Sequence, residues 1–286
     1  MSVGIRKRQK ESIRKSGKAI PAILLALLLF LLPAEGIFHK EKSCELFILL
    51  YHDLTEDEKA AESNRLYATT PEKFEADLVS VSEMGYQPLS LLDFYEGNYE
   101  AGGRYFSVTF DDGYLSNYLL AFPILEKLGI PGDIFTVVGT VGRSNHFKYF
   151  HADEMEKTGL VRIYSHTLSH LDMTSLEETE LREDISESFS LLEERLSLSR
   201  PRLISYPGGS YNDETISVLR ECGAEIQFVQ DTPPLSPPDL VKRYMVYFDT
   251  DMASLLTEFR SSLHPGLHAV KRPARETKSE WIPIEA

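Results

Sequence analysis

The chain has 286 residues, with 44 acidic and 30 basic side chains and a formal net charge of −14 at pH 7. Its hydrophobic content of 42% is enough to bury a sizeable core, and the sequence contains no internal repeat or low-complexity block. The acidic excess argues against nucleic acid or anionic lipid as a partner, because both are polyanions that repel a negatively charged protein.

The first 34 residues have the pattern of an export signal. Seven basic side chains precede an apolar run over residues 22–32, and Pro33-Ala34 follows it. The run is shorter than the ~20 residues of a membrane-spanning helix, so we expect a signal peptide, with an uncleaved membrane anchor as the alternative. Either places the protein outside the cytoplasm, secreted or attached at the cell surface.

Residues 35–286 are more acidic than the whole chain. Without the seven basic residues and one acidic residue of the leader, 23 basic and 43 acidic side chains remain, a net charge of −20. The two cysteines, Cys44 and Cys222, could pair in an exported protein, but nothing in the sequence shows that they are close.

A first buried strand is predicted over residues 46–51, a mainly apolar run that leads directly to His52. An apolar strand that delivers a titratable group at its C-terminal end is typical of the active-site end of a barrel. The alternative is a histidine at the edge of the core, bonded to backbone. Farther along, Thr70-Pro71 predicts the start of a helix, because a capping side chain followed by proline suits a first helical turn.

The second predicted strand, residues 105–110, ends on Asp111-Asp112-Gly113. Two adjacent carboxylates repel each other, and burying them unpaired is costly or forces one of them to protonate. A bound cation or a catalytic proton would explain the pair. The alternative is an ordinary surface turn, since Asp and Gly favour turns for backbone reasons.

A third predicted strand, residues 160–164, leads to Ser165-His166-Thr167-Leu168-Ser169-His170. Two histidines four residues apart lie on one side of a helical turn, so we expect both rings to reach one metal ion. A carboxylate from elsewhere would complete the set. One aspartate and two histidines with open positions for water are typical of a catalytic metal site.

Three segments follow in the C-terminal half. Thr174-Ser175-Leu176-Glu177 predicts a capping box that starts a long amphipathic helix. Residues 203–209, Leu-Ile-Ser-Tyr-Pro-Gly-Gly, predict a strand that ends in a turn. The final stretch, residues 263–286, has no periodicity and is expected to be a loose tail.

The segments Thr109-Phe110-Asp111-Asp112-Gly113 and Ser165-His166-Thr167-Leu168-Ser169-His170 resemble the first two motifs of the polysaccharide deacetylases. This is carbohydrate esterase family 4, which includes the nodulation-factor deacetylases. The similarity extends from about Phe47 to Phe259, and Tyr51-His52 resembles the subgroup acting on biofilm poly-N-acetylglucosamine. The resemblance implies an α/β fold, a distorted (β/α)7-type barrel forming a single domain over residues 35–262.

The resemblance also implies roles for the first two motifs. Asp112, His166 and His170 become the ligands of a divalent metal ion, with Zn²⁺ expected and Co²⁺ or Ni²⁺ as alternatives. Asp111 becomes the catalytic base and His52 the general acid. A late histidine supplies the acid in many relatives, so His264 is the reserve candidate.

Residues 203–209 resemble the third family motif in altered form. The resemblance assigns substrate or oxyanion contacts to Tyr206 and Gly208. Ser205 stands where relatives commonly have an arginine that orients the base, so the charge balance around Asp111 stays open. Asp231 is expected near the site as a supporting group, and Arg243 leads a segment that resembles the closing strand of the family.

The resulting hypothesis is a metal-dependent hydrolase that removes acetyl groups from a cell-surface or extracellular polysaccharide. N-deacetylation of N-acetylglucosamine polymers, of the poly-N-acetylglucosamine, peptidoglycan or chitin type, is the expected reaction. The alternatives are an O-acetyl polysaccharide esterase, a hydrolase of small amides, and a carbohydrate-binding surface protein that has lost turnover.

Overall fold

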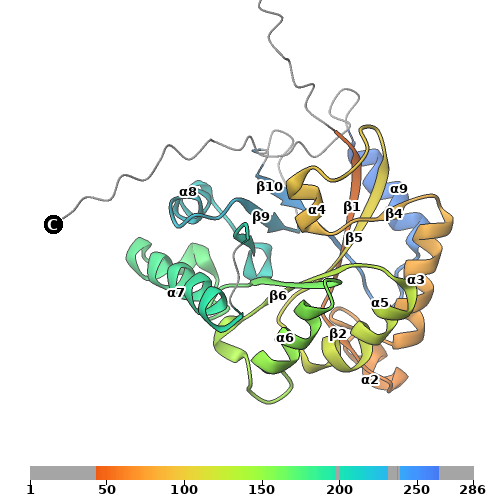
Figure 1. Cartoon of the computed structure of the whole chain (residues 1–286), viewed down its shortest axis with the longest axis horizontal. Helices are drawn as coiled ribbons and strands as arrows, with labels where there is room; N and C mark the ends of the chain where they lie inside the picture. The colour runs from red at the N-terminus through yellow and green to blue at the C-terminus, as the bar shows by residue number, and fades with distance from the viewer. Residues whose placement is uncertain (1–42, 197–199, 231–236, 238, 264–286) are drawn as a thin grey trace, which may run out of the picture. The chain divides into compact units, whose positions relative to one another are not determined.

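The computed structural model describes residues 43–196, 200–230, 237 and 239–263 (Figure 1). The expected leader, Asp231, His264 and the expected tail from residue 264 onward lie outside these described residues. Everything below concerns the described part of the compact unit that spans residues 41–286.

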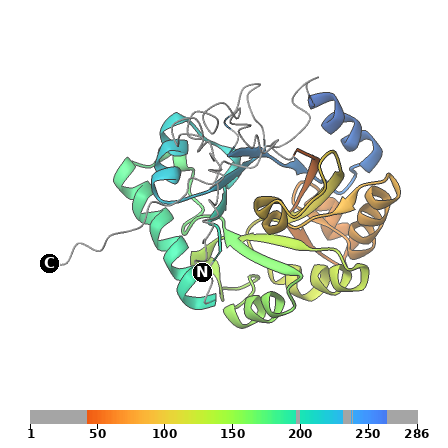
Figure 2. The same cartoon turned by 45° about the horizontal axis from the view of Figure 1, so that its top comes forward.

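A single parallel sheet organises the described residues. It has nine strands in the order β10-β9-β8-β7-β6-β5-β1-β11, with β4 paired to β5. The strands are β1 (Glu45–Tyr51), β4 (Gln87–Pro88), β5 (Arg104–Phe110), β6 (Gly132–Thr136), β7 (Val161–Ser165), β8 (Leu203–Ser205), β9 (Ile226–Val229), β10 (Leu240–Lys242) and β11 (Tyr244–Met245). The sheet curves until it is nearly closed (Figure 2), which confirms the predicted (β/α) barrel.

Helices lie on the outside of this sheet (Figure 2). They are α3 (Pro71–Glu83), α5 (Phe122–Leu128), α6 (Tyr149–Lys157), α7 (Glu178–Leu196), α8 (Asp213–Glu221) and α9 (Met252–Ser262). A smaller excursion after β1 consists of β2 (Asp53–Leu54), α2 (Glu58–Ser63) and β3 (Ala68–Thr69), and α4 (Leu91–Glu96) follows β4. The irregular turns are η1 (Asn117–Ala121), η2 (Val138–Thr140), η3 (Met173–Ser175) and η4 (Pro207–Gly209).

Two predicted helix starts had different outcomes. Helix α3 begins where Thr70-Pro71 predicted it, and the Thr70 hydroxyl accepts a hydrogen bond from the Lys73 N–H. The predicted capping box at Thr174 is wrong, because Thr174 lies in η3 and its hydroxyl bonds to Asp172. Helix α7 therefore begins only at Glu178.

Alternate residues of each strand pack on opposite faces of the sheet, as a barrel requires. Along β1, Phe47 and Leu49 join the apolar cluster beneath α3, α5, α6 and α9, whereas Leu46 and Ile48 join the cluster inside the barrel. A third cluster lies beneath α7 and α8. With both faces buried, the strands are mostly apolar, which explains why the sequence predicted them well.

Helix α4 packs against the inner cluster at the end where the strands begin. Its Leu91 and Phe94 side chains are fully buried in that cluster. The Leu91 N–H donates a 2.9 Å hydrogen bond to the Asp133 carboxylate at the start of β6. Helix α4 thus fills the interior at the end where the strands begin, and the opposite end is left for the residues that follow the strands.

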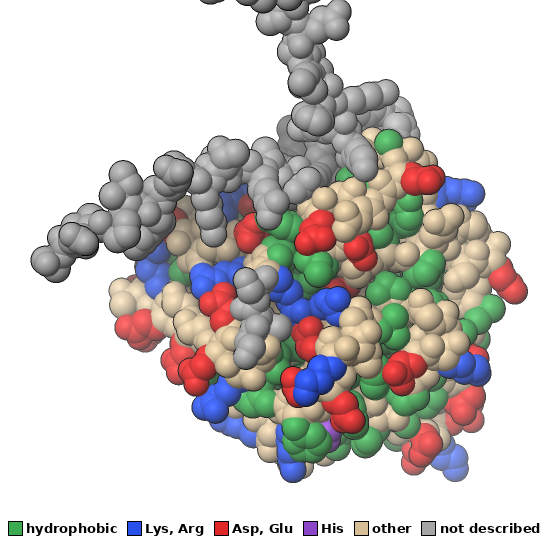
Figure 3. Space-filling model, in the orientation of Figure 1, with side chains coloured by type: hydrophobic (Ala, Val, Ile, Leu, Met, Phe, Trp, Pro, Cys, Tyr) green, Lys and Arg blue, Asp and Glu red, His purple; other side chains and the backbone are tan. Residues whose placement is uncertain are grey.

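The outer surface carries many charged side chains, as the composition of the sequence implies. Acidic and basic side chains are interspersed over the face shown in Figure 3. No helix among the described residues is both long and apolar enough to cross a membrane. Cys44 and Cys222 are both free thiols, the first buried and the second partly exposed.

Candidate active site

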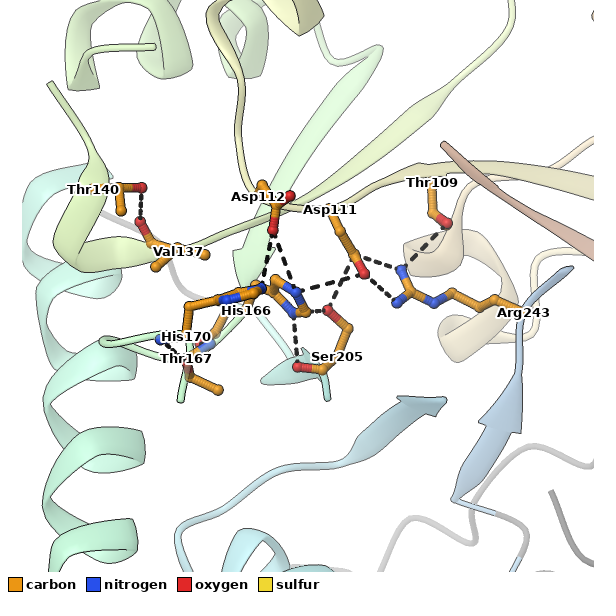
Figure 4. Close-up of polar contacts among 11 residues, drawn as sticks. Thr109, Asp111, Asp112, Val137, Thr140, His166, Thr167, His170, Ser205 and Arg243 are labelled. Carbon is orange, nitrogen blue, oxygen red and sulfur yellow. Dashed lines mark hydrogen bonds and ion pairs between the residues drawn. The ribbon is translucent and has the colours of Figure 1, made fainter. Parts of the chain in front are cut away.

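Chemically active side chains meet where neighbouring parallel strands end. His52 follows β1, Asp111 follows β5, His166 follows β7, Ser205 ends β8 and Arg243 follows β10. Because all these strands are parallel, their C-terminal ends share one edge of the barrel. Figure 4 shows the carboxylates, imidazoles and guanidinium converging there.

Asp111 forms a buried ion pair with Arg243. The Arg243 guanidinium donates to both carboxylate oxygens, at 2.7 Å and 2.6 Å, and both side chains are fully buried. Burial would raise the pKa of Asp111, but Arg243, His166 and His52 outweigh it and hold that pKa far below its usual range. Asp111 is therefore ionised at neutral pH.

Asp112, His166 and His170 have the geometry of a metal site. Their ligand atoms all lie within 4.8 Å of one another. Asp112 Oδ1 is 3.2 Å from His170 Nε2 and 3.6 Å from His166 Nε2. Atoms bound to a tetrahedral Zn²⁺ at its ordinary bond lengths lie about 3.3–3.6 Å apart. The three residues therefore fit a divalent ion with little rearrangement.

The backbone that presents these ligands is irregular. Asp112 and His170 both adopt left-handed conformations, with φ of 69° and 60°. The expected helical turn over His166–His170 is therefore wrong: Thr167 is also left-handed, and the two rings meet edge to face at 5.0 Å. Non-glycine residues rarely adopt this conformation, and it clusters at functional sites.

Gly113 allows the metal-site loop to pack closely. A Cβ atom there would lie 2.2 Å from Thr136 Oγ1, and its φ is 79°. Any other residue would clash with β6 as well as strain the backbone. The glycine after the two aspartates is therefore a steric requirement of this turn.

Ser205 links the candidate base to a candidate ligand. The His166 Nδ1 lies 3.0 Å from the Ser205 carbonyl and 2.5 Å from its hydroxyl, which donates a 3.2 Å bond to Asp111. A carbonyl only accepts, so Nδ1 carries the proton and Nε2 is free to bind a cation. The sequence had indicated Ser205 only as the loss of an arginine.

His52 borders the carboxylates from the β1 side. It is 7% exposed, and its Nδ1 has no hydrogen-bond partner among the described residues. Burial lowers the pKa of His52, while the charges of Asp111 and Asp112 partly oppose that shift. Its carbonyl accepts a 2.7 Å hydrogen bond from the Asn117 side chain, which holds the segment after β1 in place.

The turn after β8 separates the two residues predicted there. Gly208 is exposed, with a φ of 63°. The Tyr206 side chain is only 1% exposed, donates to Gln227 and packs in the cluster beneath α7 and α8. A buried side chain cannot touch a polymer, so a substrate contact by the Tyr206 ring is excluded.

Arg243 is the partner of Asp111, and the sequence did not predict this pairing. No arginine occupies position 205, and no other partner for Asp111 was predicted from the sequence. A usable signal existed, since Arg243 directly follows β10 just as His52 directly follows β1. Its guanidinium also packs over the Phe135 ring, at 5.0 Å from the ring centre.

Comparison with known proteins agrees with this arrangement. The family model for polysaccharide deacetylases matches residues 98–226. YxkH of Bacillus subtilis, a polysaccharide deacetylase by name, is 29% identical over 189 residues, covering 65% of this chain and 64% of that protein. The poly-beta-1,6-N-acetyl-D-glucosamine N-deacetylase of Staphylococcus aureus is 27% identical over 190 residues, covering 60% and 64%. The chain thus aligns with 64% of the length of each relative.

Solved structures show the same fold. IcaB from Ammonifex degensii superposes with a TM-score of 0.62 and 26% identity, covering 77% of this chain and 99% of that one. The Streptococcus pyogenes deacetylase PplD has a TM-score of 0.67 and 21% identity, covering 78% and 100%. The fold, the motif positions and the match of the family model over residues 98–226 agree, and the chain is similar to the polysaccharide deacetylases.

Proposed function

We propose that this protein is a metal-dependent hydrolase that removes acetyl groups from N-acetylglucosamine polymers outside the cytoplasm. The observation that carries the proposal is the pairing of two adjacent aspartates with different partners. Asp112 faces two imidazoles at metal-ligand spacing, and Asp111 is held ionised by Arg243. One carboxylate is thus available to a cation and the next to a proton.

A divalent ion, with Zn²⁺ expected, would be held by Asp112, His166 and His170. When bound, it would polarise the acetyl carbonyl and make a water molecule more acidic. The Ser205 carbonyl and hydroxyl orient the His166 ring toward that position. Three protein ligands leave coordination positions open, which suits catalysis.

Asp111 accepts the proton of the attacking water. Arg243 and Ser205 together hold its carboxylate in a single orientation. The same contacts keep it charged, so it is ready to take a proton at any pH near neutrality. A strongly lowered pKa also makes it a weak base, which places most of the burden of activating the water on the metal ion.

His52 donates a proton to the nitrogen that leaves with the sugar, and the exposed Gly208 N–H stabilises the negative oxygen of the attacked carbonyl. This role is supported by the position of His52 directly after β1, since that strand is paired with β5, which leads to Asp111 and Asp112. Gly208 follows β8, whose last residue touches Asp111.

The proposed substrate and the proposed location of the protein rest on similarity to known proteins. The Staphylococcus aureus relative is named for deacetylating poly-beta-1,6-N-acetyl-D-glucosamine, which favours that polymer class for this chain. An extracellular polysaccharide would require the enzyme outside the cytoplasm, in agreement with the signal-like residues 1–34.

The test is acetate release from N-acetylglucosamine oligomers by the chain without its first 34 residues. Protein stripped with chelator and reloaded with Zn²⁺, Co²⁺ or Ni²⁺ is compared with the Asp111→Asn and His52→Ala variants. We expect metal-dependent release that falls about 10²–10⁴-fold in each variant, as for loss of a general acid or base. No release from poly-N-acetylglucosamine, chitin or peptidoglycan by metal-loaded protein would leave the carbohydrate-binding alternative.

A further inference from the structure

Tyr67 is fixed at the edge of the site by the excursion between β1 and α3. Its carbonyl accepts a 2.8 Å hydrogen bond from the Asp53 N–H, and its own N–H donates to Asn64 at 2.9 Å. Arg65 is tied to the segment before α9 by an ion pair with Asp249 and a backbone bond from Phe248. The backbone around Tyr67 is therefore held from two sides.

The Tyr67 ring is exposed although it touches a buried catalytic candidate. It meets the His52 ring edge to face, with centres 5.2 Å apart, and remains 49% exposed. A large aromatic side chain held rigidly and left half open to solvent is typical of a binding surface.

A second aromatic pair lies near the candidate metal ligands. Tyr114 is two residues after Asp112, in the segment that follows β5. The Tyr114 ring also stacks on His146, with centres 5.3 Å apart and planes 22° apart. Aromatic rings therefore lie at two places around the site, Tyr67 beside His52 and Tyr114 close in sequence to Asp112.

We infer that Tyr67 is a specificity-determining residue that stacks on the pyranose ring carrying the acetamido group. The inference rests on the proposed function. His52 must reach the nitrogen that stays on the sugar, so the sugar has to lie on the His52 side, where the Tyr67 ring is exposed. The C–H face of a pyranose packs well on an aromatic ring, whereas a small acetylated compound would not extend that far.

The test compares two substrates in the metal-loaded protein. N-acetylglucosamine oligomers extend over Tyr67, and a small aryl acetate uses only the reacting centre. We expect Tyr67→Ala to lower kcat/KM for the oligomers about tenfold, mainly through KM, which is the scale of one lost aromatic contact. Hydrolysis of the aryl acetate should change less than about twofold, and Tyr67→Phe, which keeps the ring, should resemble wild type.

The matched control is Leu66→Ala, since Leu66 is the preceding residue and is 52% exposed. It should leave both substrates unaffected. Equal losses from Tyr67→Ala and Leu66→Ala would overturn the inference, as would an equal loss for the oligomer and the aryl acetate, which would mean that Tyr67 acts through His52.

A binding measurement distinguishes failure of this inference from failure of the proposed function. Calorimetric titration of oligomer into zinc-loaded Asp111→Asn protein, with and without Tyr67→Ala, needs no turnover. Binding that Tyr67→Ala weakens about tenfold supports the stacking role. Binding that this substitution leaves unchanged refutes the role while the deacetylase proposal stands, and failure of the oligomer either to bind or to be hydrolysed refutes both.

Discussion

Two buried carboxylates in the same barrel have pKa values that are shifted in opposite directions. Asp111, at the end of β5, is paired with Arg243 and its pKa is far below the usual range. Asp133, at the start of β6, is equally buried, and burial raises its pKa to about 7. It accepts one hydrogen bond, from the Leu91 N–H, and its second oxygen has no partner among the described residues.

The difference lies in what each end of the barrel supplies. At the C-terminal ends of the strands, a guanidinium, a hydroxyl and two imidazoles surround the carboxylates, so a negative charge is stabilised there. At the opposite end, α4 supplies one N–H and apolar side chains. A buried acid is therefore evidence of a functional site only when its partners are known.

The largest effect is expected from removing the partner of Asp111. Arg243→Met leaves a buried, unpaired carboxylate, which typically costs about 3–5 kcal/mol of stability. We also expect acetate release to fall at least as much as in Asp111→Asn, because the base is then no longer held ionised. Urea unfolding of the zinc-loaded protein measures the first effect, and kcat/KM the second.

The double variant Arg243→Met/Asp111→Asn is the control for that experiment. Removing both charges should recover most of the lost stability without recovering activity. If Arg243→Met alone were as stable as wild type, the ion pair would not be what stabilises the charge of Asp111.

The substitution Asp133→Asn, at the end of the barrel where the strands begin, should increase the free energy of unfolding at high pH. The folded-state pKa of about 7 lies above the ordinary value of 3.8, so the folded protein holds this proton more tightly than the unfolded chain. The resulting stability is complete below pH 3.8 and is lost as the pH rises through about 7. Asparagine keeps the acceptor for the Leu91 N–H and removes the titration, so we expect a gain on the order of 4 kcal/mol at pH 8.

The same substitution should give little gain near pH 4, where wild-type Asp133 is already neutral. Unfolding free energies of both proteins across pH 4–8 provide the test. Parallel stability curves would mean that Asp133 does not titrate in this range, and that the two ends of the barrel differ less than their contacts indicate.

A smaller effect is expected from Ser205→Ala. The hydroxyl orients His166 and contacts Asp111, but the Ser205 carbonyl keeps one bond to the same imidazole. We expect zinc affinity to fall about tenfold, the lower end of the range for outer-shell partners. Competition with a chelator measures it, with Ser210→Ala on the same turn as the control. An unchanged affinity would assign the orientation of His166 to the carbonyl alone.

The sequence predicted those elements that are determined by the pattern of neighbouring residues. The strands leading to His52, Asp111 and His166 were predicted because continuous apolar runs end on polar residues. The partner of Asp111 was not predicted, because Arg243 lies 132 positions later in the sequence and only tertiary packing joins the two residues. The residues His166–His170 share the spacing of a helical turn, but left-handed backbone at Thr167 and His170 replaces it.

The direction of the Tyr206 ring was not predicted, although strand alternation determines it. The neighbouring residue Ser205 faces Asp111, and strand alternation turns Tyr206 to the other side, against α7 and α8. That alternation was readable once residues 203–205 were assigned as a strand. The motif resemblance favoured Tyr206 as a contact, and the geometry of the strand excludes its side chain.

The most direct test is the zinc content of two neighbouring variants, Asp111→Asn and Asp112→Asn, measured beside wild type after chelator treatment and reloading. We expect Asp111→Asn to retain one bound ion while losing acetate release, and Asp112→Asn to lose both. If both variants kept the ion, or both lost it, the assignment of one aspartate to the proton and the next to the metal would be contradicted.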